Sequence, residues 1–419
     1  MRVALLSYRS KPHVGGQGVY LRHLSRELVR LGHTVEVFSG QPYPELDEGV
    51  GLTKVPSLDL YGEPKPFRNP HPREFRDRID VEEWLRMRSG AFPEPLTFSK
   101  RIVKVLAERV DDFDIVHDNQ VLGTGMLQIE KLGLPLITTL HHPISFDRRI
   151  DLAAAPSLKK RFGVWRWYSF VRMQARVARR MRLILTPSEA SKRDIAKDFG
   201  VDPARMRVIL LGVEERFVPP VKPRVPGRIL AMASADAPMK GIGTLLEAFA
   251  KLRTERDVEL VLVTKPKQGG RTEQLIERLS IGDHVRFVHG VGDDELVELM
   301  GSAEIACVPS LYEGFSLPTA ELMACATPLV VSRAGAIPEV VGPDGLCADL
   351  VRPGDVGELT AALAALLDDP ARRAAYGARG RARVEELFSW RSVAEQVAAA
   401  YQDVIDAYRV STDSTTEEK

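Results

Sequence analysis

Short apolar runs alternate along the chain with longer segments in which apolar residues recur every three or four positions. The first run, Val3 to Ser7, is followed by a helical pattern over 19–31 and by a second apolar run at 34–39. Such runs separated by helices are typical of parallel strands that helices cover on both faces. The pattern therefore predicts a parallel α/β architecture that starts at the first residues.

This alternation forms two series with a break between them. In the first series, around an irregular Pro-rich insertion at 41–75, further strands are expected at 115–117, 136–140, 183–186 and 208–213. The second series starts at 228–232, with later strands expected at 259–263, 285–288, 305–308 and 329–331. Four prolines in 218–226 stiffen the chain and oppose helix formation, so we place the domain linker there.

The length of the chain supports the same division. At 419 residues and 44% hydrophobic content, it is too long for one ordinary core and suits two α/β domains. We expect the first domain to cover 1–215 and the second 216–395. The polar segment 411–419 is expected to be a disordered tail.

Charge and cysteine content limit the classes of function. Lys and Arg total 58 against 57 for Asp and Glu, and a formal charge of +1 gives no general attraction to nucleic acid. Cys307, Cys325 and Cys347 lack CxxC spacing, which fits a reducing, cytoplasmic compartment. The apolar segment 3–6 is far shorter than a signal-peptide core or a membrane span.

One stretch, 148–182, is locally basic. It holds eleven Lys or Arg and a single acid, Asp151, interleaved with aromatic residues. A basic, aromatic helix can lie on an anionic membrane surface, which would suit a lipid-linked acceptor and a peripheral position at the inner membrane face. The alternative is a solvated face whose aromatic side chains pack into the domain.

The most informative stretch is 310–321, which follows an expected strand and leads into an expected helix. If Gly314 to Ser316 form the strand-to-helix turn, their backbone N–H groups and the helix dipole suit a diphosphate. Glu313 and Glu321 lie eight residues apart, and carboxylates accept hydrogen bonds from vicinal hydroxyls. The alternative is that both are ordinary residues at a helix start and on a helix surface.

This stretch, Glu313-Gly-Phe-Ser-Leu-Pro-x-x-Glu321, closely resembles retaining glycosyltransferase family 4. The likeness covers nearly the whole chain through further segments in the family's order: Gly15-Gly16, Leu31-Gly32-His33, Thr186 to Glu189, Lys240-Gly241, Ala324, Pro328 to Val331 and Ala334 to Glu339. It implies the GT-B fold, two facing Rossmann-like domains with parallel sheets and a cleft between them. The donor would lie mainly on the C-terminal domain and the acceptor on the N-terminal one, with a last helix at 396–410 returning to the N-terminal domain.

The resemblance assigns roles on the donor side. Glu313 is similar to the family's carboxylate for the donor sugar, Glu321 to its carboxylate for the ribose, and Lys240 to its diphosphate-binding lysine. The donor-binding backbone amides would belong to Gly314, Phe315, Ser316 and Leu317. An ammonium group at Lys240 would stabilise the departing diphosphate.

The sequence departs from the family pattern at Ala235, five residues before Lys240, where an arginine is usual. We expect Lys265 to replace that charge, because it follows the expected strand 259–263 and strand ends open onto the ligand crevice in such sheets.

The resemblance also assigns residues on the acceptor side. His141, after the expected strand 136–140, is similar to the family's histidine beside the donor sugar, whereas His142 is expected to be structural. Gly16 belongs to a loop that the family uses near the diphosphate, although a Gly-Gly turn also has a simple steric explanation. Asp118 and Asn119 are candidate acceptor contacts.

Together these features predict a retaining hexosyltransferase whose donor is a nucleotide sugar of the UDP-glucose or GDP-mannose type. The acceptor hydroxyl would belong to a sugar, a lipid-linked sugar or a small metabolite. No Asp-x-Asp follows an expected strand and no Cys/His cluster has ligand spacing, so we expect neither a metal nor a cofactor. Two alternatives stay open: a nucleotide-sugar epimerase of the same fold, and an inactive donor-binding protein, which the alanine at 235 would allow.

Family 4 enzymes retain the anomeric configuration of the donor sugar. In the expected mechanism the diphosphate departs as the acceptor hydroxyl attacks on the same face, and a phosphate oxygen takes the proton. Catalysis then comes mainly from positioning and electrostatics.

Overall fold

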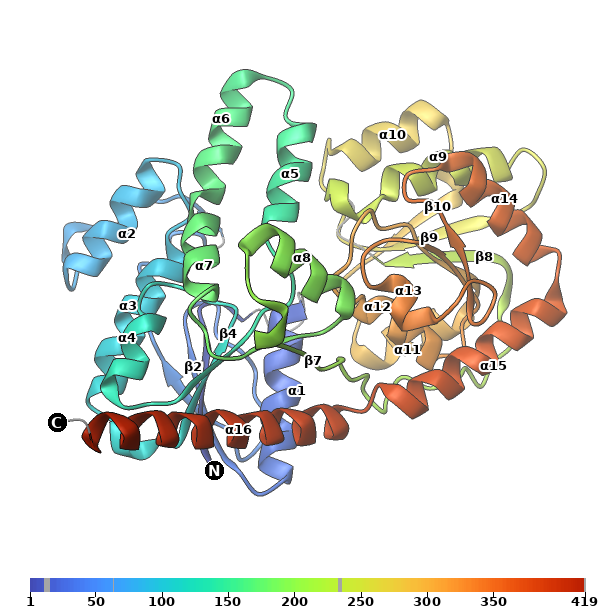
Figure 1. The fold of residues 1–419 in the computed structure, drawn as a ribbon. Coiled ribbons are helices and arrows are strands. Elements are labelled where there is room, and N and C mark those ends of the chain that lie inside the picture. Colours follow the sequence, from blue (N-terminus) through green and yellow to red (C-terminus); the bar gives the residue numbers. More distant parts are fainter. Residues whose placement is uncertain (11–15, 63, 233–235, 418–419) are drawn as a thin grey trace. The chain divides into compact units, whose positions relative to one another are not determined.

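The computed structural model describes residues 1–10, 16–62, 64–232 and 236–417. The chain forms two compact units, of which the first comprises Met1–Ile209 together with the chain from Trp390 onward, and the second is Leu210–Ser389. Figure 1 shows that each unit has a sheet with helices packed around it. Two parallel-sheet, Rossmann-like units are thus present, as the alternation of apolar and amphipathic segments predicts.

The first unit contains a seven-stranded sheet in the order β3-β2-β1-β4-β5-β6-β7. Its strands, all paired in parallel, are β1 (Arg2–Ser7), β2 (Thr34–Ser39), β3 (Gly51–Lys54), β4 (Ile115–Asn119), β5 (Leu136–Thr139), β6 (Ile184–Thr186) and β7 (Met206–Val208). In β1 the whole run from Val3 to Leu6 is fully buried, because helices cover both faces of the sheet. Chain order reverses between β1 and β4, which makes their carboxyl ends the switch point of this unit.

The helices of the first unit follow the expected rhythm. They are α1 (Gly16–Arg30), α2 (Arg78–Arg88), α3 (Glu94–Ala107), α4 (Met126–Ile129), α5 (Ser145–Ala154), α6 (Leu158–Trp167), α7 (Val171–Ala178), α8 (Glu189–Phe199) and α16 (Trp390–Glu417). Local signals set their ends: in α8, the Ser188 side chain accepts from the Ser191 amide, and Gly200 closes the helix in the left-handed conformation.

The second unit contains a six-stranded parallel sheet in the order β10-β9-β8-β11-β12-β13. Its strands are β8 (Val225–Met232), β9 (Glu259–Val263), β10 (Val285–Val288), β11 (Ala303–Val308), β12 (Leu329–Ser332) and β13 (Ala348–Val351). Its helices are α9 (Ile242–Leu252), α10 (Arg271–Leu279), α11 (Asp293–Ser302), α12 (Leu317–Ala324), α13 (Ile337–Val341), α14 (Val356–Leu367) and α15 (Pro370–Leu387). The free cysteines Cys307, Cys325 and Cys347 are all buried in this unit.

The C-terminal helix α16 belongs to the first unit. Tyr401 is fully buried, and its hydroxyl lies 2.7 Å from Nδ1 of His117 in β4. Trp390, the first residue of α16, packs on His23 of α1 with ring centroids 5.1 Å apart. The return of the last helix therefore rests on aromatic packing and on a buried hydrogen bond.

Four details differ from the sequence-based expectations. The strand expected at 208–213 is β7, which ends at Val208 because its neighbour β6 has only three residues to pair with. Residues 225–226 of the expected linker belong to β8, where the pairing with β11 shifts register and tolerates a proline.

The other two differences lie in segments that we expected to be irregular. The Pro-rich insertion at 41–75 contributes β3, a short edge strand whose residues are largely exposed. Helix α16, which begins at Trp390, continues to Glu417 through most of the segment expected to be a tail. Extending an existing helix adds one backbone hydrogen bond per residue, which lets a polar segment continue it.

Candidate active site

In the second unit, Lys240 and Glu313 meet although 73 residues separate them. Lys240 ends a short 3-10 turn (Pro238–Lys240), and Glu313 lies between β11 and α12. The Lys240 ammonium donates to Glu313 Oε1 at 2.7 Å, and the Ser310 hydroxyl donates to the same oxygen at 2.7 Å. The lysine side chain is 28% exposed and the glutamate side chain 12%, so the pair is reachable from solvent. An ammonium and a carboxylate thus share one half-buried position.

Two glycines make this meeting possible. Gly241 has a φ of +66°, and a Cβ there would lie 1.9 Å from the carbonyl oxygen of Pro309. Gly335 has a φ of +53°, and a Cβ there would lie 2.1 Å from the carbonyl oxygen of Glu313. That carbonyl accepts the Ala336 amide at 2.9 Å. Both positions need a residue without a side chain.

The turn before α12 matches the expected strand-to-helix turn. Ser316 is the N-cap, in the left-handed conformation with a φ of 85°, and its hydroxyl lies 2.8 Å from that of Thr319. Leu317 is the first helical residue, whose amide has no acceptor within the helix. The Phe315 side chain is buried edge-on against Phe388, at 5.6 Å between centroids, so only its backbone can serve a ligand.

Glu321 lies in α12, about one turn after the start of the helix. Burial and, to a smaller extent, the Glu214 carboxylate raise the pKa of its carboxyl to about 7, against the opposing effect of the Arg216 guanidinium. Among the described residues, no donor is hydrogen-bonded to this carboxylate. Arg216 itself donates to Glu214 at 2.8 Å. A half-buried carboxylate that is poorly solvated and lacks a donor is suited to accept hydroxyl groups of a ligand.

In the first unit, His141 follows β5 and is fixed from two sides. Its Nε2 lies 2.8 Å from Asn119 Oδ1, and its backbone amide donates to Gln120 Oε1 at 2.7 Å. The Tyr20 ring packs edge-on to it at 4.9 Å. Burial, aided by His142, lowers the pKa of His141 to about 3, so the ring is neutral at physiological pH. Because Asn119 Oδ1 can only accept, Nε2 carries the proton and Nδ1 is left as an acceptor.

Asp118 and Asn119 do not have the role expected of them. Asp118 is fully buried, and its carboxylate accepts the amides of Val121 and Leu122 at 2.9 and 3.1 Å, so it caps the turn after β4. Burial raises the pKa of Asp118 to about 7. Asn119 is fully buried as well and orients His141. As expected, His142 makes a structural contact, with Nε2 3.1 Å from Asp147 Oδ2.

The remaining predicted residues are Gly16 in the first unit and Lys265 in the second. Gly16 is exposed at the start of α1, with open space where a Cβ would be. Lys265 is exposed and follows β9, the neighbour of β8. The departure at Ala235 lies outside the described residues. In each unit, the site residues thus lie beyond the carboxyl ends of strands or at the helices that follow them.

Sequence reasoning gave no role to Arg216, which lies near Glu321. It also did not identify two contacts of residues that it had noted: Ser310 holds Glu313, and Asn119 sets the tautomer of His141. These contacts depend on the folded backbone and not on a motif. In the part of the chain that the structure describes, no group of three or more His, Cys, Asp or Glu could hold a metal ion. No described helix is long and apolar enough to cross a bilayer.

Comparisons with known families cover both units. Residues 14–217 match the family described as Glycosyltransferase Family 4, and residues 214–383 match Glycosyl transferases group 1. The chain is 59% identical over 406 residues to an "MMP alpha-(1->4)-mannosyltransferase" of Mycolicibacterium hassiacum, a match that spans 97% of this chain and 98% of the relative.

Solved structures share the fold at lower identity. Sucrose-phosphate synthase from Thermosynechococcus elongatus has a TM-score of 0.73 and 23% identity, over 97% of this chain and 99% of its own. The Anabaena protein HepE, solved in complex with UDP-glucose, has a TM-score of 0.69 and 17% identity, over 96% of this chain and 100% of its own.

The raised pKa of Glu321 makes a pH-dependent prediction for stability. The folded pKa of about 7 exceeds the value of about 4.3 for an unfolded chain. The protonated carboxyl therefore makes its full contribution to the unfolding free energy below about pH 4, and this contribution is lost as pH rises through 7. Because Glu321→Gln cannot ionise, its unfolding free energy minus that of the wild type should increase between pH 4 and pH 8, by at most about 3 kcal/mol.

Urea unfolding at both pH values measures this gain. Glu277→Gln, at an exposed position of α10, is the matched control and should show no such trend. If the unfolding free energies of Glu321→Gln and the wild type differ by the same amount at pH 4 and pH 8, the prediction is contradicted.

Proposed function

Because this chain belongs to glycosyltransferase family 4, we propose that it transfers mannose from a nucleoside diphosphate sugar to a carbohydrate hydroxyl, with retention of configuration. The observation that carries the proposal is the Lys240–Glu313 pair, which puts a cation and a carboxylate at one position. The 59% identity to an α-(1→4)-mannosyltransferase favours mannose, and hence GDP-mannose over UDP-glucose as donor.

The second unit would bind the donor through charge and backbone. An entering diphosphate pairs with the Lys240 ammonium in place of Glu313. Glu313 Oε1 can then accept hydroxyls of the attached sugar, while the Ser310 hydroxyl still donates to this oxygen. The amides at the start of α12 face the phosphate, and Glu321 accepts the ribose hydroxyls. Lys240 then stabilises the charge that develops on the leaving diphosphate. We propose that this happens without a metal ion or a cofactor.

His141 would act as a neutral hydrogen-bonding group in this reaction. Its Nδ1 accepts from a hydroxyl at the reacting sugar, while Asn119 keeps the ring in place. A pKa near 3 makes it a poor proton carrier at neutral pH. The acceptor proton therefore goes to the departing phosphate, and the acceptor attacks on the face that the diphosphate leaves.

The direct test is incubation of the purified protein with labelled GDP-mannose or UDP-glucose and carbohydrate acceptors. We expect mannosylated product, an α-linkage by NMR, and undiminished turnover in EDTA. Isomerised donor would establish the epimerase alternative, and binding without turnover the inactive donor-binding protein. Loss of turnover in EDTA that Mg²⁺ restores would contradict the metal-independent reaction.

Lys265 provides a second prediction on the donor. If it replaces the charge missing at Ala235, Lys265→Ala should weaken donor binding by about tenfold, the effect of one charge-assisted contact. Lys267→Ala, at an exposed lysine two residues further along, should leave it unchanged. Isothermal titration with GDP-mannose measures both. Equal affinities for the two variants would remove Lys265 from the site.

We also propose that the protein is cytoplasmic and contacts an anionic membrane surface through 148–182. In this stretch α6 has no buried residue, and Leu158, Phe162 and Trp165 are 85%, 64% and 42% exposed. They are spaced on one helical face, and Lys159, Lys160 and Arg161 lie beside them. Figure 1 shows α5 and α6 as a hairpin that stands out from the rest of its unit.

Vesicle co-sedimentation tests this contact. We expect binding to phosphatidylglycerol vesicles that weakens with salt, and little binding to phosphatidylcholine vesicles. Phe162→Asp should reduce it by about tenfold or more, since a charge replaces an inserted ring. Val221→Asp makes the same kind of change at a fully exposed apolar residue of the second unit and should have no effect. Failure of the wild type to bind the anionic vesicles would overturn the contact.

A further inference from the structure

A second group of polar and aromatic side chains lies at the switch point of the first unit. Arg9 follows β1, whose carboxyl end adjoins that of β4, where ligands bind in open α/β sheets. Glu94, at the start of α3, and Tyr61, in the irregular chain after β3, contact Arg9. Phe67, from the same irregular chain, and Trp167, the last residue of α6, pack on Tyr61. None of these five belongs to a motif of the sequence.

Arg9 and Glu94 form a pair with unused hydrogen-bonding atoms. Arg9 Nε lies 3.7 Å from Glu94 Oε2, which is too long for a hydrogen bond. Both atoms are buried, and neither has a hydrogen-bond partner among the described residues. Glu94 is 6% exposed, whereas the Arg9 side chain is 27% exposed. A buried donor and acceptor without partners are costly, which points to a ligand that supplies them.

An aromatic wall, defined as Tyr61, Phe67 and Trp167, stands beside this pair. Tyr61 packs edge-on to Phe67 at 5.5 Å and to Trp167 at 5.6 Å between centroids. The Arg9 guanidinium lies over the Tyr61 ring at 5.9 Å. Phe67 is 56% exposed and has a φ of +63°, an unfavourable conformation for a bulky residue. An exposed ring held in a strained backbone is a common feature of ligand-binding loops.

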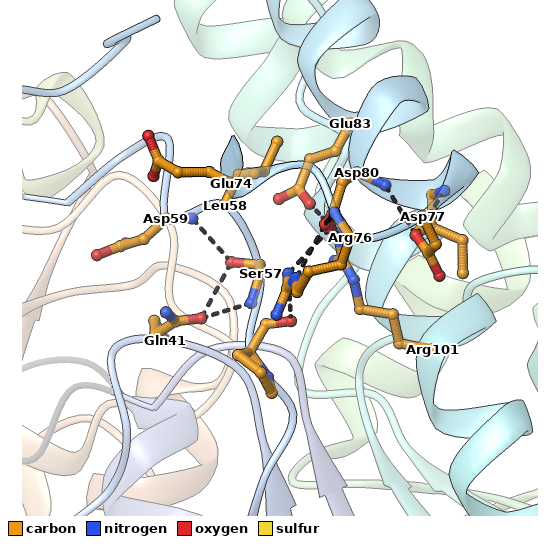
Figure 2. A network of polar contacts seen from close by, with 12 residues as sticks. Gln41, Ser57, Leu58, Asp59, Glu74, Arg76, Asp77, Asp80, Glu83 and Arg101 are labelled. Carbon is orange, nitrogen blue, oxygen red and sulfur yellow. Dashed lines mark hydrogen bonds and ion pairs between the residues drawn. The ribbon is translucent and has the colours of Figure 1, made fainter. Parts of the chain in front are cut away.

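The chain next to Phe67 is fixed by charged contacts. Arg68 donates to the Leu58 carbonyl at 2.7 Å and makes a two-pronged pair with Glu74. Figure 2 shows the polar network that includes Leu58 and Glu74, in which the Gln41 side-chain oxygen accepts two hydrogen bonds from Ser57. Phe67 is therefore presented by a loop that is organised before any ligand binds, which lowers the entropic cost of binding.

Helices α2 and α3 complete the same network. Arg101 of α3 donates to Asp80 at 2.7 Å and is paired with Glu83, and Arg76 joins Asp80 to the Pro56 carbonyl. These contacts fix the insertion to α3, the helix that begins at Glu94. None of these residues takes part in the proposed binding of the donor, which involves residues of the second unit.

We propose that Arg9 and Glu94, faced by the aromatic wall, form the acceptor subsite and bind one pyranose ring of a neutral oligosaccharide. The rings cover the apolar C–H face of the sugar, Arg9 Nε donates to a hydroxyl oxygen, and Glu94 bonds a second hydroxyl. Burial raises the pKa of Glu94 to about 8, and a protonated carboxyl both donates and accepts, as a sugar hydroxyl does. This inference rests on the proposed glycosyl transfer.

Initial rates with GDP-mannose and a short α-(1→4)-linked mannooligosaccharide test the subsite. Phe67→Ala should raise the acceptor KM by about three- to tenfold, and Arg9→Gln by about tenfold, while the donor KM stays unchanged. The matched controls are Leu85→Ala, at a residue 54% exposed in α2, and Arg88→Gln, at an exposed arginine of the same helix. Both should behave as the wild type.

Saturation-transfer NMR with the same oligosaccharide separates this proposal from the proposed function. If the wild type binds it but transfers nothing, and Phe67→Ala abolishes binding, the subsite stands and the transferase proposal fails. If the wild type transfers mannose and both subsite variants keep its acceptor KM, the subsite is overturned and the transferase proposal stands. Absence of both binding and transfer for the wild type would overturn the two together. Circular dichroism of Arg9→Gln checks that it folds.

Discussion

The Lys240–Glu313 ion pair depends on how closely three backbone segments approach one another. Gly241 lets the turn at Lys240 reach the carbonyl of Pro309, and Gly335 lets the chain after β12 reach the carbonyl of Glu313. Without these approaches the ammonium and the carboxylate could not both lie beside the tip of α12. The constraint is therefore one of backbone packing, and the electrostatics of the donor side follow from it. The parallel sheet also contributes, because it places the carboxyl ends of the neighbouring strands β8, β11 and β12 side by side.

Much of the architecture could be predicted from the sequence, because buried parallel strands are continuous apolar runs. The strand from Val3 and the strand 259–263 are examples. The edge strand β3, Gly51–Lys54, escaped prediction because most of its residues are exposed and so lack that apolar signature. The end of β7 also escaped it, since the length of its neighbour β6, and not its own composition, decides where pairing stops.

The candidate sites divide in the same way. Glu313 and Lys240 could be identified because the family pattern fixes them, and their mutual contact was not part of that pattern. Asp118 was misassigned, because a carboxylate that caps its own turn looks the same in sequence as one that faces a ligand. Arg9 and Glu94 could not be found at all, since only the fold brings together residues so far apart.

The place of α16 has a consequence for how the chain matures on the ribosome. The second unit is one continuous segment, whereas the first needs residues from 390 onward, including Tyr401, to cover His117. The amino-terminal half therefore emerges with part of its hydrophobic surface still uncovered and waits for the last helix to be synthesised. The second unit contains all of its own strands and helices, so its fold does not depend on the last helix in this way.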